Sequence, residues 1–167
     1  MMAYFFHLIS FLLVMFVEFG FLHSFTNQFA LVPLAICIGI YHVFHLRPYL
    51  GLAWLIGFGI VQDLHTVSAS GDIIISVVLG VALIYVVEQH ITHISLYAAI
   101  GTAGAIVFLW TAMRALVVTF FSGAVPVSLW LQESIVASIL ATITMWILML
   151  GLPRIRSSVA QYIRLSS

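Results

Sequence analysis

The stretch that decides the fold is Gly51-Leu-Ala-Trp-Leu-Ile-Gly57-Phe-Gly59-Ile-Val-Gln-Asp63-Leu-His-Thr-Val-Ser-Ala-Ser-Gly71. Its first part has the pattern of an apolar, glycine-dotted helix of about twelve residues. The carboxylate of Asp63 closes this helix, and a short polar run that ends at Gly71 follows. A buried helix of a soluble protein can have this pattern. In a chain this apolar, the pattern instead indicates a broken membrane segment with one anion at its tip.

The composition of the whole chain supports a membrane location. Of 167 residues, 64% are hydrophobic and 6% are charged, which is too few charges to cover the surface of a soluble domain. The five basic residues are all arginine, and a net charge of zero gives no reason to expect a nucleic-acid partner. Cys37 is the only cysteine, which excludes an internal disulfide. We therefore expect an all-α integral membrane protein.

Six apolar stretches have the length of helical membrane spans rather than of β-barrel strands. The third is about 20 Å long at 1.5 Å per residue, so we predict that this span is short or broken. The last is predicted to stop at Pro153, before a short amphipathic tail that suits an anionic membrane surface. Together they form a single polytopic domain over residues 1–167. The stretches are 4–22, 29–46, 49–62, 73–87, 94–121 and 128–152, and the tail is 154–167.

The charges predict the orientation of these spans. The positive-inside bias places the arginine-rich tail in the cytoplasm, and six spans then place the N-terminus there too. In this arrangement four of the five arginines lie at the inner face, and four of the five acidic residues lie in the outer half. The two distributions were assigned independently and agree, which supports an even number of spans.

Four ionisable residues fall at a similar depth in the outer third of the predicted bundle, at positions Glu18, Asp63, Arg114 and Glu133. An ionised group costs about 2.5–3.5 kcal/mol near the centre of a membrane helix, so these groups should pair or face water. We expect an ionic cluster around Arg114, with Asp63 and Glu133 as its partners. One reading makes this cluster a structural lock between spans, and the other makes it a proton, cation or ligand site.

Other patterns for chemistry are weak. His42 and His45 are three residues apart near the inner end of the second span, and His90 and His93 repeat this spacing in the next inner loop. Four imidazoles at one face can bind zinc, but histidines are also common at membrane interfaces without a metal. The sequence contains no nucleotide loop, zincin motif or nucleophile elbow. We therefore predict neither a cofactor, a resident metal nor an enzymatic activity.

The segment around Asp63 resembles the rod shape-determining MreD family. That family typically shows a Gly-x3-Asp-Leu-x-Ser-like sequence with a glycine following, and the corresponding residues here are Gly59, Asp63, Leu64, Thr66 and Gly71. Threonine replaces the serine, and Val67 stands where a small residue is common. The chain length, the six apolar stretches and the short basic tail are also similar. The motif-level resemblance covers residues 51–87, and the rest is similar in topology alone.

This resemblance implies a non-enzymatic scaffold of the cell-elongation machinery in the inner (cytoplasmic) membrane of a bacterium. The implied partners are an MreC-like protein, the actin-like MreB, a RodA-type glycosyltransferase and its transpeptidase. The family is also similar in architecture to the substrate-binding S components of energy-coupling-factor vitamin transporters. That similarity leaves an alternative, in which the outer ionic cluster lines a vitamin pocket. A small transporter or channel subunit is a further alternative, which depends on the intramembrane charges alone.

Overall fold

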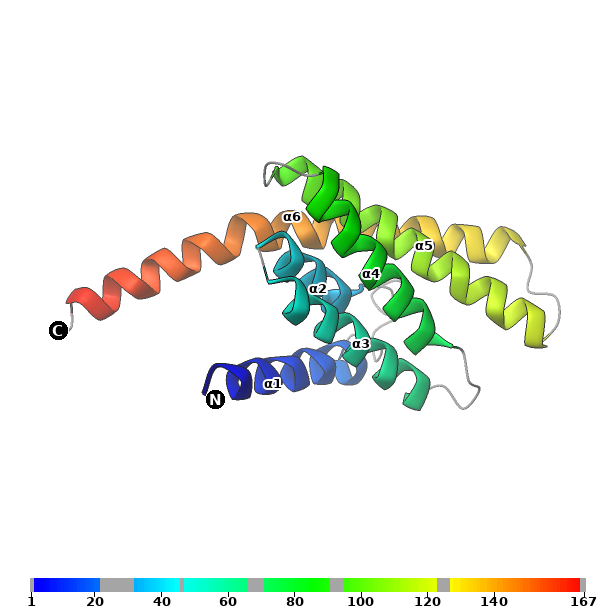
Figure 1. The fold of residues 1–167 in the computed structure, drawn as a ribbon, viewed down its shortest axis with the longest axis horizontal. Helices are drawn as coiled ribbons and strands as arrows, with labels where there is room; N and C mark the ends of the chain where they lie inside the picture. The colour runs from blue at the N-terminus through cyan, green and yellow to red at the C-terminus, as the bar shows by residue number, and fades with distance from the viewer. Residues whose placement is uncertain are drawn as a thin grey trace.

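The fold of the chain is entirely helical in the residues that the computed structural model describes, which are 2–21, 32–45, 47–65, 71–90, 95–122 and 127–165 (Figure 1). Six α-helices and one π-helical segment follow one another along the chain. In order, they are α1 (Met2–Met15), η1 (Phe16–Phe21), α2 (Leu34–Phe44), α3 (Pro48–His65), α4 (Asp72–His90), α5 (Leu96–Ser122) and α6 (Val127–Leu165).

Three of these helices are long and apolar enough to cross a membrane. Their apolar windows are Asp72–Gln89, Leu96–Phe121 and Ser128–Gly151, with mean hydropathies of 2.0, 1.8 and 2.0. At most 33% of any window is buried inside the structure, so each helix presents most of its apolar side chains outward. Such outward apolar surface is expected for a membrane protein and would be unfavourable in water.

The third helix is short and continuous, so of the two alternatives predicted for this span, short or broken, the structure shows the short one. α3 begins at Pro48 and runs for 18 residues to His65, which corresponds to about 27 Å at 1.5 Å per residue. Proline is favourable at the first position of a helix, where its missing N–H would be unsatisfied in any case. The helix continues past the predicted end at Gln62, and in its last turn the carboxylate of Asp63 binds backbone N–H groups of the next helix.

The sixth helix corrects a second expectation. The sequence suggested that Pro153 ends the last span, whereas α6 continues through this residue to Leu165. A proline inside a helix removes one backbone hydrogen bond and crowds the preceding turn, but it does not always end the helix. In Figure 1 the C-terminal part of α6 extends beyond the other helices. The amphipathic pattern expected for the tail concerns side chains that lie outside the described part of the structure.

The core of the bundle is built around α2, the shortest of the α-helices. α2 packs against α3, α5 and α6, and its buried side chains include Ile40 and Phe44. α5 and α6 pack closely over small residues, with Ser138 donating a hydrogen bond to the carbonyl oxygen of Gly104 at 2.9 Å. Four buried alanines occupy the same contact region, at Ala99, Ala103, Ala137 and Ala141. Small side chains of this kind allow helix backbones in membranes to approach closely.

Candidate functional site

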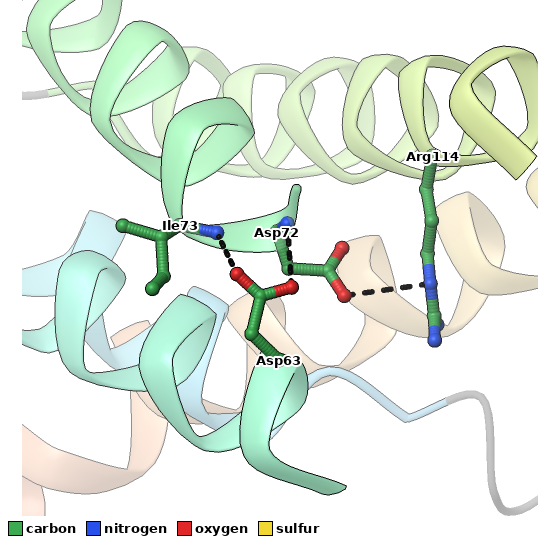
Figure 2. Close-up of polar contacts among 4 residues, drawn as sticks. All are labelled: Asp63, Asp72, Ile73 and Arg114. Atoms are coloured by element: carbon green, nitrogen blue, oxygen red, sulfur yellow. Dashed lines mark hydrogen bonds and ion pairs between the residues drawn. The ribbon is translucent and has the colours of Figure 1, made fainter. Parts of the chain in front are cut away.

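The carboxylate of Asp63 joins the end of α3 to the beginning of α4. One of its oxygens accepts a hydrogen bond from the backbone N–H of Asp72 and the other accepts one from Ile73, both at 3.0 Å (Figure 2). The first N–H groups of a helix have no partner inside the helix, and the helix dipole favours a negative charge there. Asp63 therefore acts as a cap for a helix other than its own.

Two glycines near this cap, Gly59 and Gly71, make the arrangement possible. A Cβ atom on Gly59 would lie 2.7 Å from the carbonyl oxygen of Asp72 and 2.7 Å from the hydroxyl oxygen of Ser76, so a larger residue would force α3 and α4 apart. Gly71 has a φ of +69°, a conformation that side-chain-bearing residues rarely adopt, directly before α4 begins. Leu64 is 80% exposed, and Thr66 lies outside the described residues. The glycines and the aspartate of the motif thus build one helical hairpin.

The cap positions a second carboxylate, that of Asp72, against Arg114. The side chain of Asp72 is 0% exposed, and its Oδ2 lies 3.6 Å from Nε of Arg114, which reaches across from α5 (Figure 2). This ion pair differs from the expected ones. Among the described residues, Arg114 pairs with Asp72 rather than with Asp63 or Glu133. Asp63 acts on this ion pair indirectly, because it binds the backbone N–H of Asp72, whose side chain pairs with Arg114.

Arg114 also lies over an aromatic ring. Its guanidinium carbon is 5.4 Å from the ring centroid of Trp110, one turn earlier on α5, which is within the range of a cation–π interaction. Trp110 in turn packs against Phe58 of α3, with ring centroids 5.3 Å apart. Arg114 is 32% exposed, so part of the guanidinium remains accessible after both contacts are made.

Glu18 forms a second cap between helices. It lies in the π-helical segment η1, is 4% exposed, and accepts a hydrogen bond from the backbone N–H of Ala35 in the first turn of α2 at 2.9 Å. Segments with i→i+5 hydrogen bonding are rare, and they occur often at functional sites. The structure thus uses a carboxylate twice to stabilise the N-terminus of another helix.

A cavity of about 430 Å³ lies at the end of the bundle where α3 ends and α6 begins. Three of the four residues predicted to cluster line this cavity, namely Glu18, Arg114 and Glu133, while Asp63 is not among its lining residues. The other lining residues with polar groups or aromatic rings are Phe58, Gln62, His65, Trp110, Thr111, Trp130 and Ser134. The structure therefore places the side chains of Glu18, Arg114 and Glu133, which come from η1, α5 and α6, around one space.

The histidines predicted as weak metal candidates have other surroundings. His45 stacks on Tyr41 with ring centroids 3.9 Å apart, and His42 lies edge-on to His7 at 5.5 Å. The side chain of His90 and all of His93 lie outside the described residues. Within the ranges that the structure describes, no group of three or more histidine, cysteine or acidic side chains is placed to hold a metal ion.

Two residues of the site were missed at the level of sequence, Asp72 and Trp110. Asp72 follows Gly71 directly at the beginning of an apolar run, a position where an acidic residue favours a helix N-terminus. The four-residue spacing from Trp110 to Arg114 places both side chains on one helix face. These two signals were present in the sequence, but the packing of α4 against α5 decides that Asp72 meets Arg114.

The chain matches no protein-family model, no curated protein and no solved structure in comparisons with known proteins.

Proposed function

We propose that this protein is a non-enzymatic, multi-pass scaffold of a bacterial inner membrane that resembles MreD and serves the cell-elongation machinery. In this proposal the chain crosses the membrane six times, with both termini in the cytoplasm. Its partners are an MreC-like protein and, through it, a RodA-type synthase, a transpeptidase and MreB. Its contribution to wall synthesis is to hold these partners together.

The observation that carries the proposal is the way the MreD-like motif is used. Both oxygens of Asp63 bind backbone N–H groups of α4, and Gly59 allows α3 and α4 to approach. The groups that resemble the family's motif thus hold two helices in a fixed relation. In this hairpin the carboxylate of Asp63 serves as a helix cap. Such a fixed pair of helices suits a protein that presents a constant surface to its partners.

The first helix offers a surface that suits this role. Its outward side chains are large, apolar and rich in aromatic residues, and the most exposed of them are Phe5, Phe6, Leu12 and Leu13, followed by Phe16 at the beginning of η1. In a bilayer such a face can contact lipid or the single span of a partner protein. Partner association there would require no conformational change in the hairpin.

Affinity purification from native membranes tests the proposal. The tagged wild-type chain should recover a single-span MreC-like protein together with a synthase and a transpeptidase, and depletion of the chain should turn rod-shaped cells round. A variant with Gly59→Leu, which separates α3 from α4, should lose these partners. Recovery of a pair of cytoplasmic ATPases instead would overturn the scaffold function.

The cavity favours a second candidate, a substrate-binding membrane subunit similar to the S components of vitamin transporters. Two carboxyl groups, one guanidinium and two tryptophans line a space of about 430 Å³, which lies within the range of small-molecule sites. In that case the ATPase pair is the expected outcome of the purification. A small transporter or channel subunit would rely on the same charged residues.

A further inference from the structure

The two helical hairpins of the bundle end at different levels. Arg114 pairs with Asp72, the first residue of α4, so α4 begins near the level of Arg114 on α5. From Arg114, α5 continues to Ser122, which is about 12 Å further at 1.5 Å per residue. Figure 1 shows the same difference, with the end of α5 and the beginning of α6 extending past the beginning of α4. The α5–α6 hairpin thus forms a step beside the α3–α4 hairpin.

The third helix ends at the foot of this step together with α4. Asp63, in the last turn of α3, binds the first N–H groups of α4, both at 3.0 Å. A Cβ atom on Gly59 would lie 2.7 Å from the carbonyl oxygen of Asp72, so the two helix backbones are in close contact at this level. The step is therefore a property of the whole α3–α4 hairpin and not of one helix end.

The α3–α4 hairpin lies at the perimeter of the bundle. α4 presents apolar side chains outward along its length, and Ile74, Val78 and Val81 are each exposed. α6, in contrast, packs mainly against α5 and α2. In a membrane the outward apolar side chains of α4 contact lipid. The lipid that surrounds α4 therefore also adjoins the step.

Exposed tyrosines mark the opposite end of the bundle, which gives an independent measure of length. Tyr49 and Tyr97 are the second residues of α3 and α5, and Tyr85 lies in the last two turns of α4. Tyrosine is enriched where a membrane meets water. From Tyr49 to Asp63, α3 measures about 21 Å, which is shorter than a hydrocarbon core of about 30 Å. From Tyr97 to Phe121, α5 measures about 36 Å, which exceeds that thickness.

The ionisable groups of the hairpin junction lie at the foot of the step. In a flat bilayer that ends level with α5, the residues Asp63, Asp72 and Arg114 would lie about 12 Å below the membrane surface. Ionised groups are unfavourable at such depth, and local thinning of the bilayer reduces this cost. Thinning is also the usual response of a bilayer to a short span, and it costs little per ångström of mismatch. Both the length of α3 and the position of the charges therefore favour a thinner membrane on this side.

We propose that the leaflet at this end of the bundle, the outer one in the proposed topology, is thinned beside the α3–α4 hairpin, so that phospholipid headgroups fill the step and reach the level of Asp63. The hairpin end is thus an interaction surface for the headgroup layer, while hydrocarbon of full thickness surrounds α5 and α6. This inference rests on the membrane topology of the proposed function and not on any partner protein.

Spin labels at exposed positions test the proposal in the full-length protein, reconstituted into phosphatidylcholine vesicles. Cys37→Ala removes the native thiol, and a nitroxide is then attached to Leu64→Cys in the last turn of α3 or to Ile135→Cys on α6. Ile135 lies about 12 Å from the beginning of α6, so a flat bilayer would hold the two labels at similar depth. Phe121→Cys, at the end of α5, provides the headgroup-level reference.

Electron spin echo modulation detects deuterium close to each label, supplied either as choline-deuterated lipid or as D2O. The Leu64 label should show modulation from both sources, as strong as that of the Phe121 label. The Ile135 label should show severalfold weaker modulation from both, because hydrocarbon surrounds it. Gel filtration and circular dichroism establish that each labelled variant is folded.

Three results would overturn the proposal. Equal modulation at Leu64 and Ile135 would indicate a flat bilayer. A signal from D2O without one from deuterated choline at Leu64 would indicate a water-filled vestibule, and neither signal there would indicate that hydrocarbon or protein covers the hairpin end. Each can occur while the purification from native membranes still recovers wall-synthesis partners, so failure of the lipid step is distinguishable from failure of the scaffold function.

Discussion

Two carboxylates in this protein have the same structural task but different surroundings. Asp63, in the last turn of α3, binds two successive N–H groups at the beginning of α4. Glu18, in η1, binds the N–H of Ala35 at the beginning of α2. Asp63 lies outside the cavity lining, whereas Glu18 is part of it. Asp63 therefore caps α4 through two N–H groups away from the cavity, whereas Glu18 caps α2 through one N–H group and lines the cavity.

Arg114 connects the two regions. It pairs with Asp72, whose backbone Asp63 holds, and it lines the same cavity as Glu18. A change at Arg114 should therefore disturb both regions at once, whereas changes at either carboxylate should separate them.

Replacement of Arg114 by leucine should have the largest effect. The variant leaves the fully buried carboxylate of Asp72 without its counter-ion, which typically costs about 3 kcal/mol of the free energy of unfolding. Thermal unfolding in detergent micelles should show a clearly lower Tm and a lower folded yield. The matched control is Arg47→Leu, at an exposed position, which should unfold like the wild type. A wild-type Tm for Arg114→Leu would contradict the structural role of the ion pair.

Loss of the α4 cap should have the second-largest effect on stability. Asp63→Ala removes the acceptors of two backbone N–H groups, and the loss of a cap of this kind costs about 2 kcal/mol. Asp63→Asn keeps one acceptor oxygen without the charge, so its Tm should lie between those of the alanine variant and the wild type. Glu88→Ala, at the opposite end of α4, is the control and should change little. Equal stability of Asp63→Ala and Glu88→Ala would show that the cap contributes nothing.

Close approach of α3 and α4 gives a third prediction. Gly59→Ala places a methyl group against the backbone of Asp72, and overpacking of this kind costs about 1–3 kcal/mol. Part of this cost is offset by the better helix propensity of alanine, so the net loss should be about 1 kcal/mol. Gly101→Ala is the matched control, because a Cβ there meets no atom within 4 Å, and it should be neutral or stabilising. Equal Tm values for the two variants would contradict the tight α3–α4 contact.

The sequence predicted the features that follow from composition and spacing. Apolar runs gave the approximate positions of α4 and α5, and the depth of the charged residues along their spans predicted that Glu18, Arg114 and Glu133 lie at a similar level. Depth follows from the 1.5 Å rise of a helix, so it can be counted without knowing how helices pack. For this reason the sequence could place Glu18, Arg114 and Glu133 at one depth before their packing was known.

The partner of Arg114 could not be predicted in the same way. Asp63, Asp72 and Glu133 are all at a suitable depth, and the rotation of each helix about its axis decides which carboxylate faces Arg114 of α5. That rotation depends on Gly59 and on the α3–α4 contact, which one sequence does not specify. The continuation of α6 through Pro153 also could not be predicted from the sequence. The backbone hydrogen bond that proline removes is outweighed by the many other bonds of a long helix.

The smallest effect on stability should come from Glu18→Gln, and this variant separates the two carboxylates most clearly. Glutamine keeps an acceptor oxygen for the N–H of Ala35, so the cap of α2 should survive with a loss of about 0.5 kcal/mol. Asp63→Asn should lower the Tm further, because its amide has one acceptor oxygen for the two backbone N–H groups that the carboxylate of Asp63 binds. Equal Tm values for Glu18→Gln and Asp63→Asn would contradict the difference between a cap that binds one N–H group and a cap that binds two.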